Sequence, residues 1–287
     1  MRALQPTTLE FESTPAPGHG LDVALRRALR EGELRLDFQP LVSVDDGRTR
    51  GFEALLRWRR PGCGDLTAAD FVGAAEGLAV FDDIGAWTLL EAARAAAAWP
   101  SRLRVAVNVS AAQLRSPQFP KLAQGLFDRG RLDPRRLEVE IAETALIEDL
   151  PTAAATLNEL RACGASVALD NFGGDRSSLR ALARLPLDRL KIDRGFVADA
   201  LINPRCAAVI RAAARLAKEL GLTLTGEGVE TCEQWALLRS VGCDETQGYF
   251  HSRPLPEGEL AAAFERCPGA CDMGDACRAC PRRPRYR

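Results

Sequence analysis

Apolar runs of strand length alternate with helical segments along most of this chain, and this alternation constrains its fold more than any other feature. Eight segments have the composition and the flanking turn residues of β-strands. They are Leu34–Val42, Arg50–Trp58, Arg104–Ser110, Arg136–Glu143, Ser166–Asp170, Leu187–Asp193, Leu222–Glu227 and Thr246–Phe250. Helical patterns cover Leu21–Arg30, Ala68–Glu76, Ile84–Trp99, Pro120–Arg129, Thr152–Cys163, Arg205–Leu220, Glu233–Val241 and Glu257–Arg266. The alternation predicts a TIM-like (β/α)₈ barrel rather than an open doubly wound sheet.

The first two predicted strands depart from the simple barrel pattern. Only the turn signal Asp45-Asp46-Gly47 separates them, and no helix fits between them. Parallel neighbours need a long crossover, so these two strands are expected to form an antiparallel hairpin. We therefore expect a barrel with one antiparallel strand.

The two ends of the chain differ in composition from the predicted barrel at residues 21–266. Residues 1–20 are rich in Pro, Thr, Ser and Gly and are expected to form a flexible arm. Residues 267–287 form a basic tail with four cysteines, Cys267, Cys271, Cys277 and Cys280. Four thiols so close together suit zinc or an iron–sulfur cluster, although the spacing matches no common zinc finger. A basic tail with unligated thiols is the alternative.

Charge and hydropathy exclude several classes of protein. The 287 residues include 38 basic and 39 acidic side chains, a formal net charge of −1. Such a balance gives no general attraction to nucleic acid or to an anionic membrane. No apolar run approaches the roughly 20 residues of a membrane span, and the N-terminus lacks the apolar core of a signal peptide. We expect a cytoplasmic protein that binds neither nucleic acid nor membrane.

Polar side chains lie within or at the end of seven of the predicted strands. They are Glu53, Asn108, Glu140, Asp170 with Asn171, Lys191, Glu227 and Gln247. One such residue would be explained as a hydrogen-bonded core group, but a set at the same level of the strands points to a site, because the carboxyl ends of barrel strands converge on one face. Carboxylate and amide oxygens without Cys or His favour Mg²⁺ or Mn²⁺, one or two ions per site, over zinc.

These residue types suit the hydrolysis of a phosphodiester. Lys191 would orient a water molecule or stabilise charge on phosphate, and Glu227 would serve as the general base. Arg57 shares a strand face with Glu53 and would hold a phosphate.

The motifs that carry these residues resemble the EAL domain, the phosphodiesterase domain of cyclic di-GMP signalling. In chain order they are DFQP (Asp37–Pro40), EALLRW (Glu53–Trp58), VNVS (Val107–Ser110), EIAE (Glu140–Glu143), LDNFGG (Leu169–Gly174), KID (Lys191–Asp193), GEGVE (Gly226–Glu230) and QGYF (Gln247–Phe250). The resemblance covers roughly residues 34 to 260 and implies a barrel with one antiparallel strand.

The resemblance also implies an activity and a role for each matched residue. The activity is metal-dependent hydrolysis of cyclic di-GMP to linear pGpG. The implied metal ligands are Glu53, Asn108, Glu140, Asp170 and Asn171, with Glu53, Lys191 and Glu227 as catalytic residues. The implied nucleotide contacts are Gln39, Leu55, Arg57 and Gln247, and Glu143 would hold the loop after Asp170.

The chain departs from the family pattern at one of these positions. The family has a second aspartate where this chain has Asn171, and the next loop positions Gly174, Asp175 and Arg176 also differ. An amide keeps an oxygen donor but loses a charge, so a second metal ion is expected to bind more weakly. The chain is then either a phosphodiesterase, slowed by this change, or a cyclic di-GMP receptor. An interaction module without nucleotide is the weaker third interpretation, because the other motif residues are present.

The sequence also leads to expectations for partners of the chain and for His251. Members of the family often dimerise, so a homodimer is expected, with regulation by an unidentified protein partner. His251, directly after the QGYF motif, is expected to lie in a surface loop at the mouth of the barrel.

Overall fold

Eight strands close into a barrel in the computed structural model, which describes residues 19–142, 149–174 and 179–265. The barrel strands are β1 (Leu34–Ser43), β2 (Thr49–Arg60), β4 (Arg104–Val109), β5 (Leu137–Ala142), β6 (Ser166–Phe172), β7 (Arg189–Ile192), β8 (Thr223–Gly226) and β9 (Glu245–Thr246). Each strand from β2 to β9 in this set is parallel to the next, whereas β1 pairs antiparallel with both β2 and β9. The prediction of a barrel with one antiparallel strand is confirmed.

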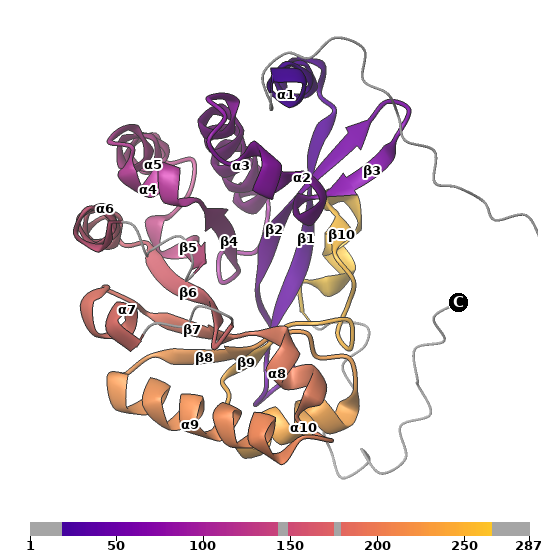
Figure 1. Ribbon diagram of the computed structural model, residues 1–287, viewed down its shortest axis with the longest axis vertical. Helices are drawn as coiled ribbons and strands as arrows, with labels where there is room; N and C mark the ends of the chain where they lie inside the picture. The colour runs from indigo at the N-terminus through magenta and orange to yellow at the C-terminus, as the bar shows by residue number, and fades with distance from the viewer. Residues whose placement is uncertain (1–18, 143–148, 175–178, 266–287) are drawn as a thin grey trace, which may run out of the picture.

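Helices cover the outside of the barrel (Figure 1). The α-helices are α1 (His19–Glu31), α2 (Ala68–Ala75), α3 (Val80–Ala97), α4 (Ala111–Arg115), α5 (Gln118–Asp128), α6 (Leu150–Ala162), α7 (Leu179–Arg184), α8 (Arg194–Asp199), α9 (Pro204–Leu220) and α10 (Cys232–Ser240). Short 3₁₀ helices occupy Pro134–Arg136 and Glu257–Ala263, the latter where a helix Glu257–Arg266 was expected. None of the helices described is both long and apolar enough to span a bilayer.

Two apolar cores hold these layers together. The larger core lies between the strands and their surrounding helices. The smaller one packs Leu25 of α1, Trp58 of β2 and Phe71 of α2 around the far ends of β1 and β2. There the two strands extend past the barrel, with β3 (Gly64–Thr67) beside β2 and β10 (Leu255–Pro256) beside β1 (Figure 1). Both edge strands were missed in the sequence because they are only four and two residues long.

The last barrel strand is shorter than the sequence predicts. A strand over Thr246–Phe250 was expected, but β9 ends at Thr246 and the chain then turns. After Thr246 the backbone pairs with Val229 instead, whose amide donates to the Gln247 carbonyl, and a Cβ added at Gly248 would lie 2.1 Å from the Val229 carbonyl oxygen. This turn carries Gln247 into the mouth of the barrel.

A layer of charged side chains fills the barrel at the amino-terminal ends of its strands, the end opposite the mouth that Gln247 lines. Glu138 lies 3.1 Å from Arg104 and 2.9 Å from Arg189, and Glu245 ion-pairs with both arginines. Burial opposes ionisation of Glu138, but the two guanidinium groups outweigh it and lower the pKa of Glu138 to about 2. Because the two arginines balance the two glutamates, all four charged side chains are tolerated in the interior of the barrel.

Candidate active site

One ammonium and four carboxylates form the floor of the candidate active site. Lys191 is 0% exposed, and its Nζ lies 2.8 Å from Glu140 Oε2 and 2.7 Å from Glu227 Oε1. Glu53 Oε2 and Asp170 Oδ1 lie 3.5 and 3.6 Å from the same nitrogen. The parallel register of β2, β5, β6 and β7 brings these ends together, and Glu227 directly follows β8. The structure therefore places the charged residues of the predicted site in one cluster.

The pKa values of the cluster reflect an excess of negative charge. Burial, followed by repulsion from Glu53, raises the pKa of Glu140 well above its ordinary value. Burial and Asp170 raise the pKa of Glu227 to about 8. Burial opposes the charge of Lys191, but the surrounding carboxylates outweigh it and raise the pKa of this lysine well above its ordinary value. One ammonium does not balance four carboxylates, so the floor favours a further cation.

Amide side chains fix the position of Glu53. Asn108 Nδ2 donates to Glu53 Oε1 at 2.7 Å, and Gln247 Nε2 donates to Glu53 Oε2 at 2.6 Å. Gln247 Nε2 also lies 3.1 Å from Gln39 Oε1, and Gln39 donates in turn to the carbonyl of Ser252 at 3.3 Å. Burial would raise the pKa of Glu53, but Lys191 and the two amides lower it. Glu53 is thus held as an anion with both oxygens occupied.

Asn171 adopts an unusual backbone conformation next to this floor. Its φ is 58°, in the left-handed region that asparagine tolerates better than most residues. Its side chain is exposed, and Nδ2 donates to Asp170 Oδ2 at 2.7 Å. The amide therefore stabilises the charge of Asp170, where an aspartate would repel it.

The two remaining predicted contacts lie away from the carboxylate cluster. Arg57 Nε donates to Asp37 Oδ2 on β1 at 2.9 Å, so its guanidinium is partly occupied. Leu55 lines a separate hollow of about 530 Å³ between the ends of β2 and β4 and helices α2 and α3, which Asn108 also lines. Glu143, Asp175, Arg176 and the four tail cysteines lie outside the described residues.

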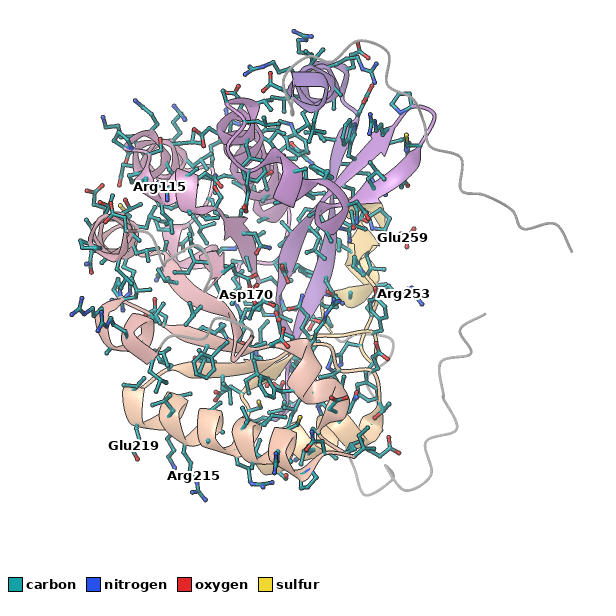
Figure 2. All side chains as sticks on the ribbon, in the orientation of Figure 1. Arg115, Asp170, Arg215, Glu219, Arg253 and Glu259 are labelled. Carbon is teal, nitrogen blue, oxygen red and sulfur yellow. The ribbon has the colours of Figure 1, made fainter. Side chains whose placement is uncertain are left out.

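The cluster opens into a cavity of about 280 Å³, into which Glu53, Asp170 and Glu227 project. Figure 2 shows Asp170 near the centre of the strands, far from Arg215 and Glu219 on the outer helix α9. Sequence reasoning missed three residues of the lining, namely Arg194, Glu230 and Tyr249. Arg194 directly follows the KID motif, and Glu230 and Tyr249 lie inside the GEGVE and QGYF motifs. Their place near the carboxyl ends of barrel strands was the available signal, since the loops there build the active-site face.

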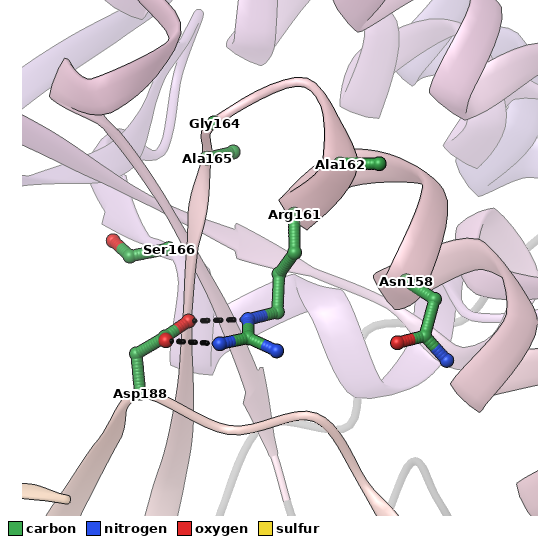
Figure 3. A pocket seen from close by; sticks show the side chains of 7 residues that line it. All are labelled: Asn158, Arg161, Ala162, Gly164, Ala165, Ser166 and Asp188. Carbon is green, nitrogen blue, oxygen red and sulfur yellow. Dashed lines mark hydrogen bonds and ion pairs between the residues drawn. The ribbon is translucent and has the colours of Figure 1, made fainter.

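A hollow of about 510 Å³ at the opposite end of the barrel has a different character. It lies beside the start of β6, and its wall includes Arg161, which pairs with Asp188 at 2.7 Å (Figure 3). It holds no group of carboxylates around a lysine. The carboxylates grouped around Lys191 lie instead at the carboxyl ends of the strands.

The expectation that His251 is a surface residue is wrong. Its side chain is 4% exposed, and Nε2 lies 2.8 Å from Thr246 Oγ1. Burial lowers the pKa of His251 to about 4, so the imidazole is neutral at physiological pH. The early end of β9 turns this residue inward, and it closes the turn that carries Gln247.

Comparison with known proteins identifies the class that this fold and site define. The model of the EAL domain family matches residues 22–254. The chain belongs to the EAL domain family.

Several characterised relatives share this domain. The chain is 38% identical to the cyclic di-GMP phosphodiesterase NbdA of Pseudomonas aeruginosa and 35% identical to the cyclic di-GMP phosphodiesterase PdeR of Escherichia coli, over 84% and 86% of this chain. These matches cover 31% and 37% of the two relatives. The chain spans about a third of the length of the curated relatives it matches.

Solved structures agree with the fold. The PaMucR phosphodiesterase in complex with c-di-GMP superposes with a TM-score of 0.79 at 36% identity, covering 84% of this chain and 99% of that chain. The FimX EAL domain from Pseudomonas aeruginosa, bound to c-di-GMP, gives a TM-score of 0.75 at 26% identity, covering 82% and 96%.

Proposed function

We propose that this chain is a metal-dependent phosphodiesterase that hydrolyses cyclic di-GMP to linear pGpG. The observation that carries the proposal is the floor of Glu53, Glu140, Asp170 and Glu227 around Lys191, which opens into a cavity at the carboxyl ends of the strands. The names of NbdA and PdeR, and the ligand in the PaMucR structure, support the choice of substrate.

The donor set fits one or two divalent ions such as Mg²⁺ or Mn²⁺. Glu140 Oε1 and Asp170 Oδ1 are buried without a hydrogen-bond partner, and the floor carries excess negative charge. In the described residues the carboxylates face Lys191, and no three His, Cys, Asp or Glu side chains surround one common position. Glu53, Asn108, Glu140, Asp170 and Asn171 would hold the ions. Bound there, such ions would supply Lewis acidity toward water and phosphate.

The chain's own residues would position the reactants and move the proton. In the hydrolysis, a water oxygen bonds to phosphorus while one ester bond from phosphorus to oxygen breaks, and the leaving oxygen gains a proton. Glu227 would accept the proton of the water, since burial and Asp170 make its carboxylate more basic than an exposed glutamate. Lys191 would hold Glu227 and Glu140 in place and orient the water from beneath.

Four residues are proposed to contact the nucleotide, namely Gln39, Leu55, Arg57 and Gln247. Gln39 lines the cavity and is fixed from both sides by Gln247 and the Ser252 carbonyl. Arg57 would contact phosphate, as in the family pattern, through the N–H groups of its guanidinium that do not bond to Asp37. Leu55 would contact the nucleotide from the neighbouring hollow.

A receptor function is the second candidate, and Asn171 favours it. Its amide donates to Asp170 Oδ2, which occupies an oxygen that a metal ion would otherwise use. A chain that binds cyclic di-GMP with only one well-held ion would release little product.

Product formation separates the two candidates. The purified chain is mixed with cyclic di-GMP and Mg²⁺ or Mn²⁺, and pGpG is followed by chromatography for wild type, Glu53→Ala and Asn171→Asp. The enzyme proposal expects pGpG from wild type and none from Glu53→Ala. Nucleotide binding without product from wild type, with cleavage restored by Asn171→Asp, would instead establish the receptor.

The other sequence-based expectations stay predictions. They are a homodimer, a regulatory protein partner, and zinc at Cys267, Cys271, Cys277 and Cys280. Zinc content per chain, measured with and without the tail, tests the last.

A further inference from the structure

We propose that Arg194 binds the phosphodiester of cyclic di-GMP that is not being cleaved. The inference rests on the proposed function and adds a substrate-binding residue outside the motifs identified in the sequence. It depends on where Arg194 lies, on the charge of the cavity and on the chemistry of a substrate with two phosphates.

The fold delivers Arg194 to the rim of the cavity. It is the first residue of α8, three residues after Lys191, and Asp193 caps the helix by accepting from the Gly195 amide at 2.8 Å. On its other side lies Gly228, where an added Cβ would come within 2.5 Å of Arg194 Cβ. Gly228 also has a φ of +67°, so both the close contact with Arg194 and the left-handed backbone favour glycine at this position. The segment that carries Glu227 can therefore pass directly against Arg194.

The cavity needs a cation on its wall. Glu53, Asp170, Glu227 and Glu230 all line it, whereas Arg194 is the one basic residue in its described lining. Lys191 lies beneath the carboxylates, fully buried, and is engaged with them. Divalent ions would offset Glu53 and Asp170, but Glu227 and Glu230 in the lining would still repel an anionic substrate unless an exposed cation opposes them.

Arg194 is available for this task. Its side chain is exposed, and it forms no ion pair with any residue that the structure describes. Arg57, by contrast, is tied to Asp37 at 2.9 Å and also donates to the Leu56 carbonyl at 3.0 Å. Arg57 also lies outside the lining of this cavity.

The substrate supplies the matching anion. Cyclic di-GMP contains two phosphodiesters in one ring, each with one negative charge. When one lies over the carboxylate floor for cleavage, we place the other against the wall of the cavity that carries Arg194. A guanidinium binds phosphate oxygens through two parallel N–H groups, which an ammonium does not reproduce.

Binding and kinetics test the assignment. A Glu227→Gln background stops turnover, and calorimetry with cyclic di-GMP and Mg²⁺ at low and high salt then compares the parent with Arg194→Ala, Arg194→Lys and the control Arg215→Ala. Arg215 is exposed on the outer helix α9, far from Asp170 (Figure 2). KM and kcat for pGpG formation are measured with the same substitutions in the active chain.

We expect Arg194→Ala to weaken binding about tenfold, as for the loss of one charge-assisted contact, with a smaller dependence on salt. KM should rise with kcat nearly unchanged, and Arg194→Lys should restore part of the affinity. Equal affinity and salt dependence in Arg194→Ala and Arg215→Ala would overturn the role of Arg194 while leaving the proposed function intact. A parent that does not bind cyclic di-GMP would overturn both.

Discussion

The Nζ atom of Lys191 lies 2.7 Å from Oε1 of Glu227, and this pair joins the ends of two neighbouring parallel strands. Lys191 has no exposed surface, so its charge is felt almost wholly by the carboxylates around it. The lysine therefore has a structural role besides the one proposed in catalysis: it makes the burial of four acids tolerable. Removing it should reveal how strongly those acids repel one another.

Replacing this lysine should lower stability in a way that divalent ions correct. In Lys191→Met, four buried carboxylates lose their ammonium, and the free energy of unfolding at pH 7 in EDTA should fall by roughly 3 kcal/mol. Added Mg²⁺ should recover more stability in the variant than in wild type, because the ion replaces the missing charge. Urea denaturation with and without Mg²⁺ measures both effects.

Lys218→Met is the matched control, because Lys218 is exposed on α9. It should change neither stability nor the response to Mg²⁺. If Lys191→Met behaved like this control, the electrostatic account of the floor would be wrong.

Asn171 should set the affinity of the second metal ion. Asn171→Asp adds a carboxylate beside Asp170 and removes the amide that now donates to Asp170 Oδ2. Calorimetry with Mn²⁺ should show a weak site that tightens by about tenfold, since an opposite charge within contact distance contributes at least 1 kcal/mol or so. Asn158→Asp, in the wall of the hollow beside the start of β6 (Figure 3), should leave Mn²⁺ binding unchanged. Identical titrations for the two variants would argue against a metal-binding role for position 171.

The sequence was sufficient to predict which strands bring polar residues together, because each such residue stood within or at the end of an apolar run. Asn108 and Glu140 are register partners on β4 and β5, as convergence requires. The same strand logic also predicted the antiparallel β1 from the missing helix between β1 and β2.

Contacts between residues that lie far apart in the sequence could not be predicted in this way. The pairing of Arg57 with Asp37 depends on the β1–β2 register, and the burial of His251 depends on Gly248 packing against Val229. Neither has a local signal in the sequence. The place of Arg194 directly after the KID motif was a signal for the active-site face, but its packing against Gly228 could not be predicted.

The charged layer at the base of the barrel should make the fold sensitive to acid. Arg104 and Arg189 lower the pKa of Glu138 to about 2, against an ordinary value near 4.5. The stabilisation is therefore complete above pH 4.5 and is lost as the pH falls toward 2, with a total on the order of 3 kcal/mol. Glu138→Gln should be less stable than wild type at pH 6, and the gap should narrow between pH 4.5 and 2.

Urea denaturation across this pH range provides the measurement. Glu159→Gln, an exposed position on α6, serves as the control and should follow wild type throughout. A constant gap between Glu138→Gln and wild type from pH 6 to pH 2 would contradict the assigned ionisation.

His251 should give the free energy of unfolding a second pH dependence, which arises from burial of a neutral imidazole rather than from an ion pair. Burial lowers its pKa to about 4 from 6.5, so between these values the unfolded chain takes up a proton that the folded chain refuses. Stability should therefore fall as the pH drops from 6.5 to 4, by roughly 3 kcal/mol in all.

His251→Phe abolishes this proton uptake and should flatten the fall in stability, while at pH 7.5 the substitution should cost about 1 kcal/mol for the lost bond to Thr246. Thr246→Val removes the same bond but keeps the imidazole, so it should lose stability at pH 7.5 and retain the steep fall. Parallel pH profiles for His251→Phe and Thr246→Val, measured by urea denaturation, would show that the imidazole does not titrate in this window.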